Sequence, residues 1–287
     1  MQGKVVVITG ATSGLGRIAA NRLADMGARL VVVARDRARG EALVAELRAK
    51  GGGEHGIHYA DLSRLAEVNR VGAEIAAAEP RIDVLINNAG SIFGSRVVTE
   101  DGLERTFATN HMAYFVLTLS LLNRLKAAAP SRVVNTASDA HKGKSLDFDD
   151  LQTTKGYAAQ HAYGRSKLAN ILFTRELARR LTGTGVTANC LHPGFVTTGL
   201  GQRDGWFGIA VWVAMRFAGK PEPGAATIVH LASSPEVANV SGEYFYDRRP
   251  VLPSRGAQDD DAARRLWEES ERIAEHSAGR SRESGNP

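Results

Sequence analysis

A short apolar run followed by closely spaced glycines, at residues 5–16, most constrains what this chain can fold into. The run begins VVVI, four β-branched residues in a row, which is typical of a strand buried on both faces of a parallel sheet. Glycines then break the run, and apolar residues recur at helical spacing from Ile18 until Gly27 ends the pattern. The stretch therefore predicts a central strand, a glycine-containing turn and a helix.

The turn has the composition of a dinucleotide-binding site. Its glycines are Gly10, Gly14 and Gly16. Such a turn brings unpaired backbone N–H groups and the positive end of a helix dipole to one point, and glycines let a pyrophosphate approach without a Cβ in the way. The spacing is G-x-x-x-G-x-G instead of the usual G-x-G-x-x-G, so a plain structural turn stays open as an alternative at this point.

Strand and helix patterns alternate along the rest of the chain. Further strands are predicted at residues 30–34, 56–60, 84–86, 132–137, 186–191 and 243–246. Further helices are predicted at about 35–50, 65–78, 103–125, 162–181 and 224–232. This alternation predicts a single Rossmann-like, doubly wound α/β domain, with helices on both faces of a mostly parallel sheet of about seven strands in the order 3-2-1-4-5-6-7. The catalytic domain spans residues 1–253. A charged extension, 254–287, follows, with a short helix around Trp267 and disorder from Ser281.

Composition limits the class of protein. The 287 residues carry a net charge of +5, but Lys and Arg are scattered among Asp and Glu, which argues against a nucleic-acid partner. Cys190 is the only cysteine, so no intrachain disulfide is possible, and its neighbours favour a buried core thiol over a nucleophile. Asp147, Asp149 and Asp150 lack the spacing of a calcium loop, and no metal site is predicted.

The start of the chain and its hydropathy bear on the compartment. Lys4 leads directly into the first strand, which leaves no room for a signal peptide. No apolar run approaches the roughly 20 residues that a bilayer span requires. We therefore expect a soluble, cytoplasmic protein.

The end of the second predicted strand indicates which dinucleotide is bound. In a dinucleotide fold this position faces the adenine ribose, where an acid accepts from the 2′-OH and an arginine matches a 2′-phosphate. Ala34 is followed here by Arg35, which favours NADP(H), whereas the adjacent Asp36 leaves NAD(H) possible. A solvated loop arginine is the structural alternative.

Polar residues follow several other predicted strands, at the edge where open α/β sheets bind ligands. They are Asp61, the amides Asn87 and Asn88, Ser138, and His192 with Pro193 and Gly194. Asn110 is expected to be buried within the helix 103–125, where an unpaired amide is costly. It must therefore have partners, structural or functional.

Tyr163 and Lys167 lie four residues apart in a predicted helix, so both can face one cleft. A free tyrosine has a pKa of about 10, but a nearby ammonium and a cationic nicotinamide ring favour the phenolate and lower that pKa. The pair is therefore a candidate general acid or base. Taken alone, such a pair is more often a surface contact.

In combination, these motifs resemble the short-chain dehydrogenase/reductase family over nearly the whole chain. The matching segments are TGATSGLG at 9–16, NNAG at 87–90, Asn110, Ser138, YGRSK at 163–167 and PG at 193–194. TASDAH at 136–141, the 25-residue step from Ser138 to Tyr163, YGRSKLAN, LHPG and SGEYF are similar to the retinol dehydrogenase and WW-domain oxidoreductase branch. The chain departs from the pattern at Ser13, where many NADP-dependent members carry a basic residue, and at Ala137, where serine is common.

The resemblance implies roles for the residues in these motifs. Tyr163 would transfer the proton and Ser138 would hydrogen-bond the carbonyl oxygen. Lys167 would bind the nicotinamide ribose and lower the tyrosine pKa, and Asn110 would hold a relay water. The cofactor-binding residues so predicted are Gly10, Thr12, Ser13, Gly14, Leu15, Gly16, Arg35, Asp61, Leu62, Asn87, Ala89, Gly90, Tyr163, Lys167, Pro193, Gly194, Val196 and Thr198.

The predicted function is NADP(H)-dependent interconversion of a carbonyl and an alcohol, with hydride from the nicotinamide and the proton from Tyr163. A nucleotide-bound Rossmann scaffold that senses redox state is the alternative, but it would not require Ser138, Tyr163 and Lys167 together. Light-dependent reduction of a chlorophyll precursor, as in some related proteins, uses additional cysteines that this chain lacks.

Residues 205–218 read GWFGIAVWVAMRFA and follow the sixth predicted strand. This is more apolar surface than a solvated loop exposes. As part of a substrate lid at about 195–220, the segment would line a pocket for a bulky hydrophobic aldehyde, ketone or alcohol, retinoid-like or steroid-like. A helix packed on the domain, a homo-oligomer interface and peripheral membrane contact are the alternatives.

Overall fold

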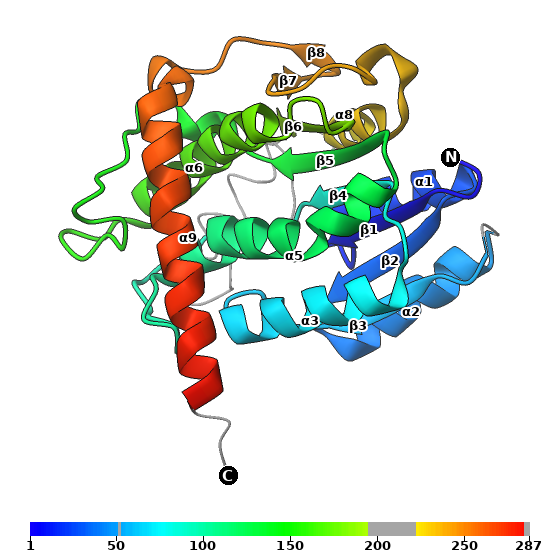
Figure 1. Cartoon of the computed structure of the whole chain (residues 1–287), viewed down its shortest axis with the longest axis horizontal. Coiled ribbons are helices and arrows are strands. Elements are labelled where there is room, and N and C mark those ends of the chain that lie inside the picture. Colours follow the sequence, from blue (N-terminus) through cyan, green and yellow to red (C-terminus); the bar gives the residue numbers. More distant parts are fainter. Residues whose placement is uncertain (51–52, 195–221, 284–287) are drawn as a thin grey trace.

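The computed structural model describes residues 1–50, 53–194 and 222–283. Within them, one eight-stranded sheet forms the centre of the molecule, and helices cover both of its faces (Figure 1). The strands are β1 (Val5–Thr9), β2 (Arg29–Ala34), β3 (Gly56–Tyr59), β4 (Val84–Asn87), β5 (Ser131–Thr136), β6 (Val186–His192), β7 (Tyr244–Tyr246) and β8 (Arg249–Pro250). The proposed lid, with Val196 and Thr198, lies outside the described residues.

The helices alternate with the strands, as the sequence predicted. The α-helices are α1 (Gly14–Asp25), α2 (Arg37–Arg48), α3 (Leu65–Ala78), α4 (Arg105–Phe107), α5 (Ala113–Ala127), α6 (Ala159–Arg180), α8 (Glu222–Ser233) and α9 (Asp260–Glu283). A π-helix, η1 (Ala108–Met112), separates α4 from α5. The 3₁₀ turns are η2 (Asp139–His141), η3 (Pro235–Val237) and η4 (Arg255–Gln258).

The strand order is β3-β2-β1-β4-β5-β6-β7-β8, which confirms the predicted order. β1 to β7 run parallel, and β8 pairs antiparallel with β7. The sequence did not indicate β8, because the turn before it, Asp247 and Arg248, adopts positive φ of 43° and 64° without a glycine to mark it. The order reverses between β1 and β4, and open α/β sheets bind ligands outside the carboxyl ends of the strands at such a point.

Alternate side chains of each strand enter apolar cores on opposite faces of the sheet. Val7 and Val31 pack on one face with residues of α3 and α5, and Val6 and Ile8 pack on the other with α1, α2 and α8. Burial on both faces explains why these strands read as continuous apolar runs. Cys190 is buried in a third cluster, and burial raises the pKa of its thiol to about 12, as expected for a core thiol.

The helix predicted over residues 103–125 is interrupted by η1. A π-helix fits an extra residue into one turn and often occurs at functional sites. The apolar spacing of the sequence gives no sign of this insertion, because apolar residues continue on the buried face through α4, η1 and α5. Asn110 lies within η1.

The C-terminal extension departs furthest from the prediction. In place of a short helix around Trp267, α9 spans Asp260–Glu283 and packs against α6 and α3 (Figure 1). Of the end predicted to be disordered, residues 284–287 lie outside the described residues. Trp267 is buried between Phe115 of α5 and Phe173 of α6, with ring centroids 5.0 and 5.9 Å away. The extension reads as charged because the opposite face of this amphipathic helix lies in solvent.

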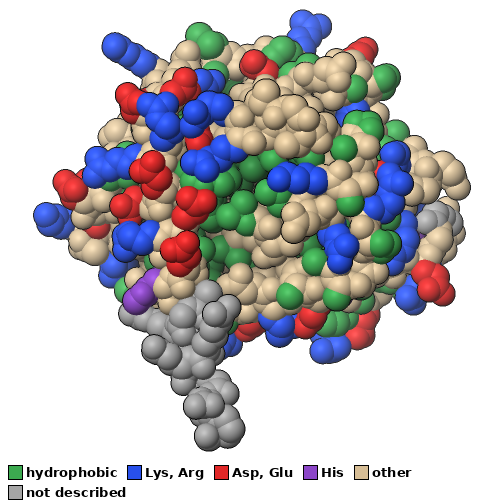
Figure 2. Space-filling model, in the orientation of Figure 1, with side chains coloured by type: hydrophobic (Ala, Val, Ile, Leu, Met, Phe, Trp, Pro, Cys, Tyr) green, Lys and Arg blue, Asp and Glu red, His purple; other side chains and the backbone are tan. Residues whose placement is uncertain are grey.

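The exposed side of α9 carries charges of both signs. Figure 2 shows acidic and basic side chains intermixed along this helix. In the described ranges, no helix has the length and apolar composition that crossing a membrane requires.

Candidate active site

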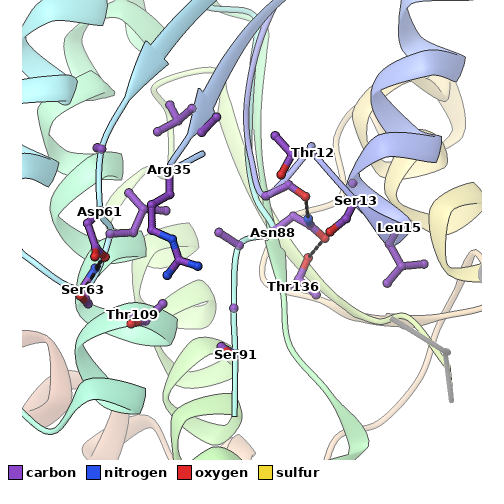
Figure 3. Close-up of a pocket in the computed structure, with 18 of the residues that line it drawn as sticks. Thr12, Ser13, Leu15, Arg35, Asp61, Ser63, Asn88, Ser91, Thr109 and Thr136 are labelled. Carbon is purple, nitrogen blue, oxygen red and sulfur yellow. Dashed lines mark hydrogen bonds between the residues drawn. The ribbon is translucent and has the colours of Figure 1, made fainter. Parts of the chain in front are cut away.

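A cavity of about 310 Å³ opens at the carboxyl ends of β1 to β5 (Figure 3). This volume is in the range of small-molecule sites. The predicted site residues that line it are Gly10, Thr12, Ser13, Leu15, Gly16, Arg35, Asp61, Leu62, Ala89, Gly90, Tyr163, Lys167 and Pro193. Residues that the prediction did not assign also line it, among them Arg39, Ser63, Asn88, Phe93, Thr109 and Thr136. The fold therefore brings most of the predicted site together.

The glycine turn between β1 and α1 leaves no room for side chains. A Cβ on Gly10, whose φ is +67°, would lie 2.7 Å from the Ala89 backbone, and one on Gly16 would lie 2.2 Å from the Gly10 carbonyl. Ser13 precedes α1 without capping it through its side chain. The first N–H groups of α1 and the Ser13 hydroxyl thus remain available beside the cavity, which fits the pyrophosphate of a dinucleotide.

Arg35 and Asp36 have different surroundings at the end of β2. The exposed Arg35 side chain extends into the cavity in Figure 3 and has no hydrogen-bond or ion-pair partner in the described part of the chain. Asp36 caps α2 by accepting a hydrogen bond from the Arg39 N–H, 3.0 Å away, and its carboxylate lies 3.7 Å from Nε of Arg39. The cation is therefore free to meet an anion, whereas the carboxylate is already engaged.

Asp61 shapes the wall of the cavity after β3. Its Oδ1 accepts hydrogen bonds from the Ser63 N–H and Oγ, at 2.9 and 2.8 Å. Leu62 between them is largely buried but still lines the cavity. Figure 3 shows Asp61 and Ser63 on the side of the cavity opposite Thr12 and Ser13.

Asn88 joins three strands at the floor of the cavity. Its Nδ2 donates to the carbonyl oxygens of Thr9 and Gly10, at 3.3 and 3.2 Å, and its Oδ1 accepts from Oγ1 of Thr136, at 3.4 Å. The Thr9 hydroxyl oxygen in turn accepts from the N–H groups of Asn88 and Ala89. This junction fixes the ends of β1, β4 and β5 relative to one another.

Asn87 faces the core, although the resemblance placed it among the cofactor-binding residues. It is fully buried, and its Nδ2 donates to Oγ1 of Thr118 and Oδ1 of Asn135. Consecutive residues at a strand end point to opposite sides, so Asn88 lines the cavity and Asn87 does not. That alternation was the available signal for choosing between the two amides.

Tyr163 and Lys167 project from α6 into the cavity, as the four-residue spacing predicted. Nζ of Lys167 lies 5.5 Å from the centre of the Tyr163 ring and donates a 3.0 Å hydrogen bond to the Thr136 carbonyl. Ser138 hydrogen-bonds Tyr163 through its side chain, and its Oγ also accepts from the Ala140 N–H. The three predicted catalytic side chains therefore meet at one end of the cavity, although Ser138 itself does not line it.

Burial is the main influence on the pKa values of Tyr163 and Lys167. It raises the pKa of Tyr163 to about 12, against a smaller lowering by the Ser138 hydrogen bond, and it lowers the pKa of Lys167 to about 7. Desolvation disfavours the charged form of each group. The prediction that the lysine charge and a bound nicotinamide lower the tyrosine pKa stays a prediction.

Asn110 lies directly behind the cavity. Its Oδ1 accepts from the Ser91 N–H at 2.8 Å, and its Nδ2 donates to the Ser91 carbonyl and to Oγ of Ser166, at 2.9 and 3.0 Å. Ser166 in turn donates to the Tyr163 carbonyl. Asn110 thus has the partners that its burial required, and it joins the loop after β4 to the helix that carries Tyr163.

Four predicted cofactor-binding residues remain. Gly14 begins α1 and Gly194 follows Pro193, but neither lines the cavity. Gly194 adopts a φ of +84°, which favours glycine. Val196 and Thr198 fall outside the described residues.

Comparison with known proteins agrees with this geometry. A family model described as short chain dehydrogenase matches residues 4–205. The chain belongs to the short-chain dehydrogenase family. This dehydrogenase is 45% identical to retinol dehydrogenase 14 of Homo sapiens, over 94% of this chain and 86% of that protein. It is 41% identical to retinol dehydrogenase 13 of Homo sapiens, over 94% and 84% of the two chains.

Solved structures of similar fold extend the comparison. An uncharacterised protein from Mycobacterium paratuberculosis has a TM-score of 0.76 and 33% identity to this dehydrogenase, over 96% of this chain and 94% of that one. A short-chain dehydrogenase from Burkholderia cenocepacia J2315, in complex with NADP, has a TM-score of 0.68 and 28% identity, over 90% and 99%. The protein is thus an oxidoreductase that acts on CH–OH donors with NAD(P) and interconverts an alcohol and a carbonyl.

Proposed function

We propose that this dehydrogenase prefers NADP(H) to NAD(H), with Arg35 binding the 2′-phosphate. The observation that carries the proposal is the contrast between Arg35, which extends unpaired into the cavity, and Asp36, which caps α2. A guanidinium matches a phosphate with parallel hydrogen bonds, whereas Oδ1 of Asp36, which also lines the cavity, is already engaged in capping α2. Arg39 also lines the cavity and adds positive charge there.

The proposed chemistry assigns one step to each residue at the other end of the cavity. The cofactor, when bound, supplies or accepts the hydride. Tyr163 gives the proton of its hydroxyl to the carbonyl oxygen during reduction and takes one back during oxidation. Ser138 holds the same oxygen beside the tyrosine, Lys167 binds the nicotinamide ribose, and Asn110 holds a relay water. The hydrogen bond between Ser138 and Tyr163 supports this arrangement.

The proposed substrate is a hydrophobic aldehyde, ketone or alcohol, of retinoid-like or steroid-like size. Two observations support it: the similar human proteins are named retinol dehydrogenases, and Phe93 lines the cavity. The further assignment of residues 205–218 to a substrate lid rests on their apolar sequence alone.

Arg35→Ser tests the cofactor preference. We expect kcat/KM for NADPH to fall roughly 10- to 100-fold, since hydrogen bonds to charged groups contribute about 1.5–3 kcal/mol, while kcat/KM for NADH changes little. The matched control is Arg37→Ser, because Arg37 is exposed nearby but stacks on the Tyr59 ring, 4.2 Å from its centre, and does not line the cavity. An unchanged NADPH preference in Arg35→Ser, or a parent that prefers NADH, rejects the proposal.

A series of straight-chain aldehydes of increasing length tests the substrate class. We expect kcat/KM to rise with length by up to about fourfold per methylene, since burying each contributes about 0.8 kcal/mol. Trp206→Ala and Trp212→Ala should flatten this dependence, and Met26→Ala, at the end of α1 away from the cavity, should not. A flat series in the parent would point to a small polar substrate.

A further inference from the structure

Residues 254–277, the C-terminal segment, contact the two elements that carry Asn110 and Ser138. The first contact involves His111, the residue after Asn110 in η1. Its Nε2 lies 2.9 Å from Oγ of Ser270 in α9. The Ser270 hydroxyl also donates to the Leu266 carbonyl, at 2.7 Å. The contact between Nε2 and Oγ holds the imidazole against α9.

The surroundings of His111 make this bond important for the shape of η1. His111 and Ser270 are both fully buried, and the rings of Phe107, Phe115 and Phe173 lie around the imidazole. Burial lowers the pKa of His111 to about 4, against a smaller raising by a hydrogen bond with the Asn170 side chain, so the ring is neutral at working pH. A buried ring nitrogen without a hydrogen-bond partner is costly, so Ser270 and Asn170 together define where this ring lies.

Asn110 and His111 make hydrogen bonds on opposite sides of the π-helix. Asn110 bonds Ser91 and Ser166 on the cavity side, and His111 bonds Ser270 on the α9 side. A π-helical turn is an uncommon and local distortion that persists only where surrounding contacts favour it. The bond to α9 is such a contact, and it is adjacent to the residue that joins β4 to the Tyr163 helix.

The second contact involves His141, the last residue of η2. Its Nε2 accepts from the Ser254 N–H at 3.1 Å, so the ring proton lies on Nδ1, which donates to the Ser138 carbonyl at 2.7 Å. The side chain is fully buried, and its ring lies edge-on to Tyr244, 5.2 Å between centres. A neutral histidine thus joins the backbone of Ser138 to the start of the C-terminal segment.

We propose that the C-terminal segment is a positioning element of the catalytic site, acting on Asn110 through Ser270 and His111 and on Ser138 through Ser254 and His141. The inference rests on the catalytic roles given to Asn110 and Ser138 under the proposed function. It makes Ser270, His111 and His141 positioning residues that touch neither cofactor nor substrate. The expected signature is a loss in kcat with KM for the cofactor unchanged.

Two serine-to-alanine variants on the same helix test the first contact. Ser270→Ala removes the hydrogen-bond partner of Nε2 of His111, and Ser277→Ala removes a buried hydroxyl that donates to Asp101 at 2.7 Å, away from η1. We expect Ser270→Ala to lower kcat roughly tenfold, because small misplacements of a catalytic group are costly. Ser277→Ala should keep the kcat of the parent, although both variants lose a buried hydrogen bond. Equal kcat values in the two variants overturn this half of the proposal.

Rescue by a conservative replacement tests the second contact. Glutamine has both a donor and an acceptor in its side chain, so His141→Gln should keep most of the kcat that His141→Leu loses. Equal activity in these two variants contradicts the link to Ser138. If the parent reduces a carbonyl and the variants keep its kcat, the positioning role alone is rejected. If the parent reduces no carbonyl, the proposed function is rejected and this inference with it.

Discussion

Tyr163 lies in surroundings that keep its phenol protonated. Burial raises its pKa to about 12, so the phenol is neutral at pH 7, whereas the neighbouring Lys167, with a pKa lowered to about 7, is about half protonated there. The sequence predicted a lowered tyrosine pKa from the lysine charge and a bound nicotinamide ring. The burial of both groups was not visible from their spacing. A protonated phenol suits proton donation during carbonyl reduction.

Replacing Tyr163 with Phe tests its role and its titration together. We expect turnover to fall roughly 10²- to 10⁴-fold, the usual contribution of a general acid or base, while the Kd for NADPH stays close to that of the parent. In the parent, alcohol oxidation needs the phenolate and should rise about tenfold per pH unit below the tyrosine pKa, whereas reduction should vary little. Stopped assays at a series of pH values measure both slopes.

Tyr59→Phe is the matched control for that experiment, because the Tyr59 hydroxyl lies 3.5 Å from Glu41 on the exposed side of β3. It should have the turnover and pH profile of the parent. A Tyr163→Phe protein that turns over at a near-parent rate would reject the mechanism and favour the redox-sensing scaffold.

At the scale of the elements, the strands and most helices follow from local patterns, whereas two features depend on tertiary contacts. The run at residues 5–8 indicates a buried strand because both faces of the sheet are covered. The π-helix η1 has no such signal, because its extra residue is stabilised by partners distant in the sequence, Ser91 and Ser270. The length of α9 was likewise hidden, because its apolar stripe is narrow among charged residues.

Trp267→Ala tests how strongly α9 is held. Trp267 is 5% exposed and contacts Phe115 and Phe173, and the guanidinium of Arg180 lies 4.3 Å from the centre of its ring. Truncating a buried aromatic residue typically destabilises a protein by about 3–5 kcal/mol. We expect a loss of this size in the free energy of unfolding, measured by denaturant titration.

Glu268→Ala, on the exposed side of the same helix, is the control and should change the free energy of unfolding by less than about 0.5 kcal/mol. Similar effects in the two variants would mean that α9 contributes little through its apolar face.

At the scale of the whole molecule, the sequence supported the sheet order and most of the cavity. Alternating strands and helices leave few topologies, and the carboxyl ends of parallel strands meet at one edge, so Gly10, Arg35 and Asp61 converge there. What it did not supply were side-chain directions at the strand ends and contacts across long sequence separations. Asn88, which joins β1, β4 and β5, is an example of the first. The contact of Ser270 with His111 is an example of the second.

The packing of α9 against α6 has a consequence during synthesis of the chain. Every other described element precedes α9 in the sequence, and a nascent chain emerges from the ribosome with its N-terminus first. Until α9 is synthesised, the apolar surfaces of Phe115 and Phe173 remain uncovered, and Ser270 is not there to receive His111. A nascent chain that lacks α9 therefore exposes these aromatic rings, and an exposed apolar surface of this kind binds chaperones and favours aggregation.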